Sequence, residues 1–158
     1  MARVFLAGQA LDGTSGHETG RKLLAQLYAA HAEGELPEIA IAPGGKPYFV
    51  TSPWHFSISH TKRHAFCALA DCPIGIDAEE ADRAIDLKIA PKILSPGELS
   101  QFAQADDPRD CLLRFWVLKE ASAKWTGEGI RWHPNHTSFS LPDRRIQELE
   151  GCLLAVVY

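Results

Sequence analysis

The most apolar helix that this 158-residue chain can form has the sequence Cys111-Leu-Leu-Arg-Phe-Trp-Val-Leu-Lys119-Glu120-Ala-Ser-Ala-Lys124-Trp125. Leu113, Trp116 and Val117 recur at the spacing of three and four residues that places side chains on one face of a helix. Phe115 and Leu118 make other faces of the same helix apolar as well. We therefore expect this helix to be largely buried in the core.

Two charged groups, Glu120 and Lys124, share the face that Leu113 and Val117 define. Burying a charge costs free energy unless the charge is paired or holds a metal ion. One interpretation is an ion pair between these two residues, which contributes only about 0.2–0.5 kcal/mol on an open helix. The other interpretation is that both charges serve a binding or catalytic site, and the helix alone does not decide between the two.

Capping residues and glycines mark the ends of the expected elements. Ser15-Gly-His-Glu18 and Ser95-Pro-Gly-Glu98 have the spacing of capping boxes, Asp107-Pro108 is typical of a helix start, and Gly127 of a helix end. We expect helices to begin at these three starts, the first of them ending at Gly34. Alternating and β-branched patterns predict strands at residues 3–8, 38–42, 55–59, 64–70, 74–79, 137–141 and 152–158.

The order of these elements indicates an α+β fold. The first half has a strand, a helix and then strands, and the second half has helices and then strands, so we expect two similar α/β lobes. We place the N-terminal lobe at residues 1–80 and the C-terminal lobe at residues 81–158. The length suits one domain, or two small halves that share a core.

Composition and charge exclude several classes of function. The net charge of -4 argues against non-specific nucleic-acid binding, which needs a basic surface. No apolar run approaches the length of a membrane span, and the N-terminal segment is too short and weakly apolar for a signal peptide. The cysteines have no Cys-x-x-Cys spacing, so reduced thiols are a simpler interpretation than disulfides or zinc, and we expect a cytoplasmic protein; they are Cys67, Cys72, Cys111 and Cys152.

A pair of carboxylates lies in the expected strand at residues 74–79. Asp77 and Glu79 alternate on this strand, so both side chains leave the same face, where like charges repel. Together with Glu120 they offer three oxygen ligands, the donor type that Mg²⁺ prefers. Acidic pairs are also common on solvated strand ends, so the pair alone is weak evidence. Glu80 points to the opposite face, and we expect it to face solvent.

Basic residues near glycines and hydroxyl groups suggest a phosphate ligand. Lys119 and Lys124 lie in the apolar helix, while Lys46 follows two glycines and His60 follows Ser59. Lysines beside a carboxylate-bound Mg²⁺ are suited to moving charge on a phosphoryl group. Plain alternatives are a hydrogen-bonded histidine at a strand end for His60 and a surface turn for Lys46. The absence of P-loop, dinucleotide and His-Glu-x-x-His motifs counts against nucleotide hydrolases, Rossmann enzymes and zincins.

Four motifs occur in one order along the chain: Gly45-Lys-Pro-Tyr-Phe49, Phe56-Ser-Ile-Ser-His60, Ile74-Gly-Ile-Asp-Ala-Glu79 and Trp116-Val-Leu-Lys-Glu-Ala-Ser-Ala-Lys124. Together they closely resemble the 4′-phosphopantetheinyl transferases, specifically the larger, surfactin-synthetase-activating type, here with a shorter N-terminus. The resemblance covers roughly residues 16 to 141. It implies that the two lobes form an intramolecular pseudo-dimer with the active site in the cleft between them, and that the protein is a monomer.

The resemblance also implies roles for individual residues. Asp77, Glu79 and Glu120 match the carboxylates that bind Mg²⁺, with Mn²⁺ as an alternative. Glu120 also matches the candidate base for the incoming serine hydroxyl, and Asp77 and Lys124 complete the catalytic set. Lys119 and Lys124 match the groups on the coenzyme A phosphates. The nucleotide contacts are implied for Ser59 and His60 at the 3′-phosphate and for Gly45 and Lys46 beside the adenine.

The implied reaction transfers 4′-phosphopantetheine from coenzyme A to a serine of an apo acyl or peptidyl carrier protein and releases adenosine 3′,5′-bisphosphate. Two other classes remain open. One is a different Mg²⁺-dependent phosphoryl-transfer enzyme that uses the same carboxylates. The other is a non-catalytic paralogue that binds only coenzyme A or a carrier.

Overall fold

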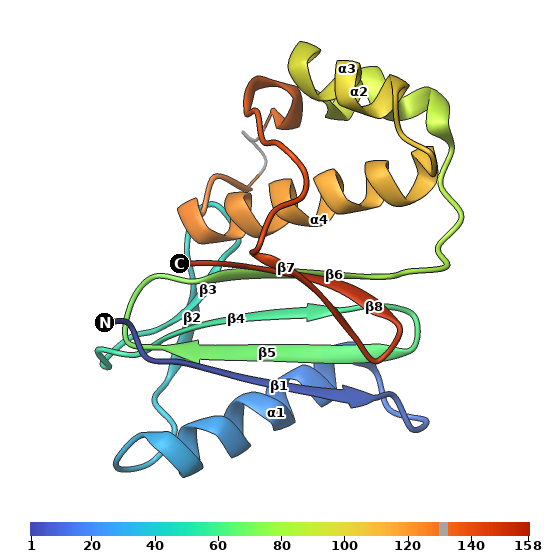
Figure 1. Ribbon diagram of the computed structural model, residues 1–158. Coiled ribbons are helices and arrows are strands. Elements are labelled where there is room, and N and C mark those ends of the chain that lie inside the picture. Colours follow the sequence, from blue (N-terminus) through green and yellow to red (C-terminus); the bar gives the residue numbers. More distant parts are fainter. Residues whose placement is uncertain (130–132) are drawn as a thin grey trace.

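The computed structural model describes residues 1–129 and 133–158, and the described elements stack in four layers (Figure 1). Helix α1 covers a sheet of order β1-β5-β4, a second sheet of order β6-β8-β7 packs on the first, and α4 covers the second sheet. The elements are β1 (Val4–Ala10), α1 (Gly16–His31), β2 (Ile39–Ile41), β3 (Pro47–Phe49), β4 (His55–His60), β5 (His64–Ala70), β6 (Gly75–Glu80), η1 (Leu87–Ile89), α2 (Ala90–Ile93), α3 (Pro96–Ala103), α4 (Pro108–Thr126), η3 (Pro134–His136), β7 (Ile146–Leu149) and β8 (Cys152–Val157).

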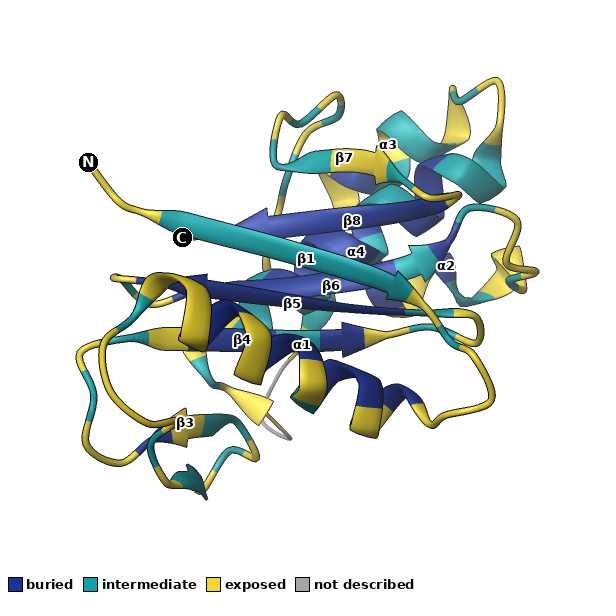
Figure 2. Cartoon of the chain, turned by 90° about the horizontal axis from the view of Figure 1, so that it is seen from below, coloured by how far each residue is buried: buried dark blue, intermediate teal, exposed yellow. Residues whose placement is uncertain are grey.

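The central strands β5 and β8 are buried on both faces (Figure 2). In β5, Cys67 and Leu69 face α1, whereas Phe66 faces the second sheet. In β8, Leu153 faces α4 and Leu154 faces the first sheet. All strand pairs are antiparallel, so these apolar runs arise from burial between layers rather than from a parallel sheet. The prediction of an α+β fold is confirmed, and the structure adds that its sheets are antiparallel.

Three helix starts and the end of α4 follow the capping signals in the sequence, whereas α1 ends at His31, three residues before the predicted stop at Gly34. Ser15 caps α1 and Ser95 forms a reciprocal capping box with Glu98, while Asp107 accepts from the third residue of α4. Gly127 ends α4 with a left-handed conformation (φ 77°) that glycine adopts without steric cost. The long helix is buried as predicted, because its other faces pack against α2 and α3.

One predicted strand is absent, and two observed strands, β3 and β7, were not predicted. Residues 137–141 form no strand, because their backbone N–H groups bond to side chains of α3: Phe139 donates to Glu98 and Leu141 to Gln101. The strand that pairs with β8 is β7, and Glu150 and Gly151, both with positive φ, make the tight turn between them. Strand β3, which the sequence did not predict, pairs with β2.

The two sheets meet along β4 and β6. The backbone N–H groups of Ile76 and Ala78 on β6 donate to the hydroxyl oxygens of Ser57 and Ser59 on β4, each at 3.0 Å. The two serines thus satisfy buried edge groups that would otherwise lack partners. Strand β6 pairs with β8 and is part of the second sheet, although it precedes residue 81, where we expected the second lobe to begin.

Helix α4 approaches β6 closely at Gly75. A Cβ atom at this position would lie 2.1 Å from the backbone oxygen of Ala121 and 2.3 Å from the backbone nitrogen of Trp125. Contacts of this length do not occur in folded proteins, so only glycine permits this helix-to-strand distance. None of the described helices combines the length and apolarity that crossing a membrane requires.

We expect Gly75→Ala to lower the free energy of unfolding by about 3 kcal/mol, because α4 must move off the sheet to admit the methyl group. Chemical denaturation measures the change. Gly97→Ala is the matched control: it lies in a helix, and its nearest added contact is Ser138 Oγ at 3.7 Å. Equal stabilities of the two variants would contradict the close approach.

Candidate active site

A cavity of about 210 Å³ brings together three of the predicted motifs. Gly45 and Lys46 line it from the turn before β3, Ile58 lines it from β4, and Glu120 and Lys124 line it from α4. These residues are up to 79 positions apart in the sequence. The cavity therefore lies where the turn, the first sheet and the long helix meet.

Asp77 and Lys124 form an ion pair at the edge of this cavity. Lys124 Nζ lies 3.0 Å from Asp77 Oδ1, and Ser59 donates to the same oxygen at 3.3 Å. Lys124 thus pairs across to β6 rather than with Glu120 on its own helix, so the ion pair within the helix is not formed. The second oxygen, Asp77 Oδ2, is buried without a hydrogen-bond partner among the described residues.

Glu79 lies beside Asp77 but is turned toward other groups. Trp116 Nε1 donates to its Oε1 at 3.1 Å, and Arg83 pairs with the same oxygen. The oxygens of Asp77, Glu79 and Glu120 do not all lie within 4.8 Å of one another. The three carboxylates thus belong to one site, but Trp116 and Arg83 hold the side chain of Glu79 partly away from the other two.

The carboxyl groups of the site carry raised pKa values. The pKa of Asp77 is raised to about 6, because burial and the Glu79 carboxylate raise it more than Lys124 lowers it. Burial raises the pKa of Glu120 to about 7, and Asp77 and Glu79 add to this against Lys124. Neighbouring carboxylates with an unpartnered buried oxygen fit a hard divalent cation, because such an ion relieves both the repulsion and the missing partner.

The glycine–lysine turn packs against the end of α4. A Cβ at Gly44 would lie 2.2 Å from the backbone oxygen of Gly127, and one at Gly129 would lie 2.0 Å from the oxygen of Gly44. Lys46 Nζ donates to the backbone oxygens of Ile74 at 3.0 Å and Trp125 at 3.4 Å. Burial lowers the pKa of this lysine. Lys46 therefore fastens the turn to β6 and to the negative end of the helix dipole.

Ser59 and His60 lie at the end of β4, with different surroundings. Ser59 is buried in the β4–β6 seam, whereas His60 is exposed and lies against the first turn of α1, where a Cβ at Gly16 would be 2.4 Å from its ring. Helix N-termini favour anions. Of the two, His60 is the residue that a ligand can reach.

Lys119 does not join this site, which corrects the expectation that it contacts phosphate. Its side chain is 0% exposed, and its Nζ lies 2.7 Å from Glu98 Oε1 and donates to the backbone oxygens of Pro134 and Thr137. Lys119 points from α4 toward α3, away from the face that carries Glu120. Its role is to join α3, α4 and the segment before residue 138.

Glu80 does not face solvent, contrary to our expectation. It is 7% exposed and accepts hydrogen bonds from Thr61, Arg63 and His64. The opposite face of β6 is not a solvent face, because the first sheet covers it.

Three residues near the site were missed by the sequence analysis. Ser57 was signalled only by its alternation with Ser59 on an apolar strand, and Trp116 was assigned to the core. Arg83 follows the end of β6, and nothing in its sequence context indicates the pair with Glu79. A wider hollow of about 1030 Å³ between β1 and β7 offers no comparable chemistry, because its acid, Asp143, is paired with Arg145.

Metal-free protein should lose stability as the pH rises through the raised pKa values. The folded protein binds protons on Asp77 and Glu120 more tightly than the unfolded chain, so stability present at low pH is lost as pH rises toward about 7. We expect the thermal midpoint in EDTA to fall more between about pH 5 and about pH 8 in the wild type than in Glu120→Gln. Glu33→Gln, an exposed control, should behave like the wild type. Equal falls in Glu120→Gln and the wild type would contradict the assignment.

Lys119→Met should lower the free energy of unfolding by about 3 kcal/mol, because it leaves Glu98 as an unpaired buried charge. Denaturant unfolding measures this loss, and the exposed Lys92→Met should show none. If Lys119→Met had normal stability but bound coenzyme A more weakly, Lys119 would instead contact phosphate, as first predicted.

Comparisons with known proteins identify the family of this chain. The model of the 4′-phosphopantetheinyl transferase superfamily matches residues 73–154, which include β6, α4 and β7. A 4′-phosphopantetheinyl transferase of Bacillus subtilis is 33% identical over 137 residues, covering 77% of this chain and 61% of the relative.

Two further relatives show the same level of similarity. 4′-Phosphopantetheinyl transferase Sfp of Bacillus subtilis (strain 168) is 35% identical over 63% of this chain and 50% of its own length. 4′-Phosphopantetheinyl transferase psf-1 of Bacillus pumilus is 35% identical over 71% of this chain and 48% of its own length. The chain thus spans about half the length of these relatives. The family match covers more than half of the chain, and the chain belongs to the 4′-phosphopantetheinyl transferase superfamily.

Proposed function

We propose that this protein transfers the 4′-phosphopantetheine group of coenzyme A to a serine of an apo acyl or peptidyl carrier protein, releasing adenosine 3′,5′-bisphosphate. The observation that carries this proposal is that Glu120 and Lys124 line one cavity and Asp77 pairs with that lysine, on a chain of this superfamily. Transfer of this group is a phosphoryl transfer, in which positioning and charge neutralisation supply most of the catalysis.

Asp77, Glu79 and Glu120 would hold Mg²⁺, or Mn²⁺ in its place. When bound, the ion neutralises charge on the pyrophosphate of coenzyme A. The buried Asp77 Oδ2, which has no described partner, and the repulsion that Asp77 and Glu79 exert on Glu120 support this donor set. Glu79 accepts from Trp116 and pairs with Arg83, so its carboxylate is oriented before any ion arrives.

Glu120 takes the proton of the serine hydroxyl in this proposal. A base must lie within reach of the proton that it takes, and Glu120 lines the cavity beside Lys124. Lys124 places its ammonium beside the leaving phosphate while Asp77 Oδ1 keeps the lysine oriented. Both side chains come from one buried helix, so their separation is set by the backbone.

The remaining contacts with coenzyme A fit the surfaces around the cavity. His60, exposed beside the N-terminal turn of α1, is suited to bind the 3′-phosphate. The neighbouring Ser59 holds this end of β4 against β6 by accepting the hydrogen bond from Ala78. Gly45 and Lys46 line the cavity from the turn expected beside the adenine. The cavity is small for a whole ligand, so it accommodates one part of coenzyme A.

We further infer that the two sheets and their helices are lobes of an intramolecular pseudo-dimer. Sheet orders β1-β5-β4 and β6-β8-β7 are equivalent: in each, the first strand lies at one edge, the last lies in the centre, and the helix after the first strand covers the sheet. The active site then lies between the lobes of one monomer. The four described cysteines are unpaired, which suits the reducing cytoplasm.

The test is incubation with coenzyme A, Mg²⁺ and an apo carrier protein, followed by intact mass measurement of the carrier. We expect the mass to increase by one phosphopantetheine group with the wild type and with the exposed control Glu33→Gln, and not with Glu120→Gln. No mass increase with any of several carriers, while coenzyme A still binds, would favour a binding paralogue. Turnover by Glu120→Gln at the wild-type rate would refute its role as base.

A further inference from the structure

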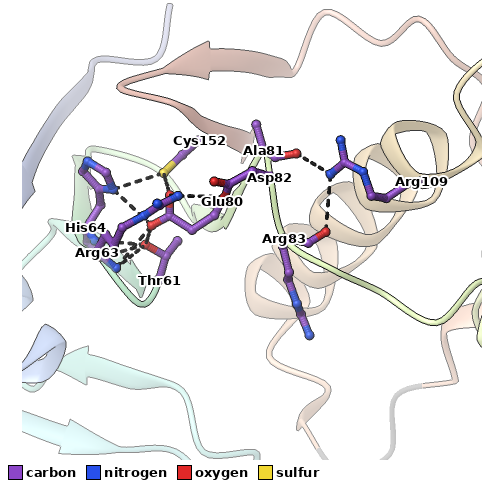
Figure 3. Close-up of polar contacts among 9 residues, drawn as sticks. All are labelled: Thr61, Arg63, His64, Glu80, Ala81, Asp82, Arg83, Arg109 and Cys152. Atoms are coloured by element: carbon purple, nitrogen blue, oxygen red, sulfur yellow. Dashed lines mark hydrogen bonds and ion pairs between the residues drawn. The ribbon is translucent and has the colours of Figure 1, made fainter.

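A second cluster of metal-ligating side chains lies between the sheets, on the face of β6 opposite Asp77 (Figure 3). Glu80 comes from the end of β6, His64 from the start of β5 and Cys152 from the start of β8. The side chains of Glu80 and His64 are 9% and 15% exposed, and Cys152 as a whole residue is 0% exposed. The proposed transfer reaction uses none of the three.

The ligand atoms of this cluster are already separated as they would be around one ion. His64 Nδ1 lies 3.1 Å from Glu80 Oε1, Cys152 Sγ lies 3.5 Å from His64 Nδ1, and Cys152 Sγ lies 3.6 Å from Glu80 Oε2. In a tetrahedral zinc site, with bonds of about 2.3 Å to sulfur and about 2.0–2.2 Å to nitrogen or oxygen, neighbouring ligand atoms lie about 3.3–3.6 Å apart. The observed separations are close to this range, and since the two that involve Glu80 use different oxygens, its carboxylate must turn for one oxygen to join the other two ligand atoms.

We propose that His64, Glu80 and Cys152 bind one Zn²⁺ ion, with a water molecule as the fourth ligand. One nitrogen, one oxygen and one sulfur donor select a borderline-soft cation and disfavour Mg²⁺, which prefers oxygen ligands only. The water reaches the site from a surface hollow of about 490 Å³ that Thr61, Arg63 and Glu80 line.

Arg63 balances the negative charge of Glu80 when no ion is bound. Its guanidinium lies 3.0 Å from Glu80 Oε2 and 2.7 Å from Asp82 Oδ1, and its side chain is 56% exposed. It can therefore leave Glu80 and keep Asp82. Burial raises the pKa of Cys152 to about 12, and the charge of Glu80 adds to this. Zinc binding breaks the S–H bond of Cys152 and forms a Zn–S bond, with the thiol proton released to solvent. It also replaces the Nδ1–H bond of His64 with a Zn–N bond, and by exchange with solvent the neutral imidazole then carries its proton on Nε2.

An ion in this position would join both sheets. It would link β5 of the first sheet to β6 and β8 of the second, at the end of the β4–β6 seam. The adjoining chain is already fixed, because Arg109 donates to the backbone oxygens of Ala81 at 2.5 Å and Arg83 at 3.3 Å (Figure 3). The proposed ion is structural, and binding should stabilise the fold.

Co²⁺ is the probe, because a cobalt–thiolate bond gives a near-ultraviolet charge-transfer band that oxygen ligands do not give. We expect the band at one ion per chain in the wild type, in Cys72→Ser and in Asp77→Asn, and its loss in Cys152→Ser. Cys72 is the control thiol, and Asp77→Asn separates this site from the carboxylates of the proposed active site. No band in the wild type, or a band that persists in Cys152→Ser, would overturn the proposal.

Two further measurements keep the test independent of how Cys152→Ser folds. X-ray absorption of the wild type loaded with one Zn²⁺ should show one sulfur neighbour at about 2.3 Å, and a shell of only nitrogen and oxygen would overturn the site. Zn²⁺ should raise the thermal midpoint by about 5 °C.

Arg63→Gln should bind Co²⁺ more tightly than the wild type, because it removes a cation beside the site, and weaker binding would contradict the geometry.

Discussion

The hydroxyl group of Ser59 accepts a hydrogen bond from the Ala78 N–H and donates one to Asp77, and this junction joins the two sheets. Ser57 repeats the first of these bonds to Ile76. Because buried N–H groups must find acceptors, two small hydroxyl side chains allow β4 and β6 to lie side by side without a backbone ladder. The position of Asp77 on the side of β6 that faces α4, and the close approach of α4 at Gly75, depend on this seam.

Two buried pairs in α4 show how stability and function are divided along one helix. Lys119 and Glu98 are fully enclosed, and the backbone groups of Ser95 and Phe139 satisfy the remaining carboxylate lone pairs. Lys124 and Asp77 are less complete, since one carboxylate oxygen has no described partner and Glu120 stands nearby with its pKa raised to about 7. The complete pair stabilises the structure, whereas the incomplete one retains unsatisfied charge that a ligand can use.

Local sequence signals predicted the parts of this molecule that depend on near neighbours. The caps at Ser15, Ser95 and Asp107 and the stop at Gly127 set the helices, and the apolar run at residues 64–70 is a strand. The errors arose where distant groups compete for the backbone or side chain. Residues 137–141 lost strand pairing to the side chains of α3, and Glu80 and Lys119 were drawn inward by partners 16 to 21 positions away.

The sequence by itself determined the family, three helix starts and the residue types of the candidate site, because motifs and caps are read from short spacings. Only the tertiary structure decided which charges meet: Lys124 with Asp77 instead of Glu120, Lys119 with Glu98, and a scattered cysteine with His64 and Glu80. Such pairings depend on how the sheets stack and where glycines allow close approach. Those distances are set by packing across the whole chain, which no local pattern encodes.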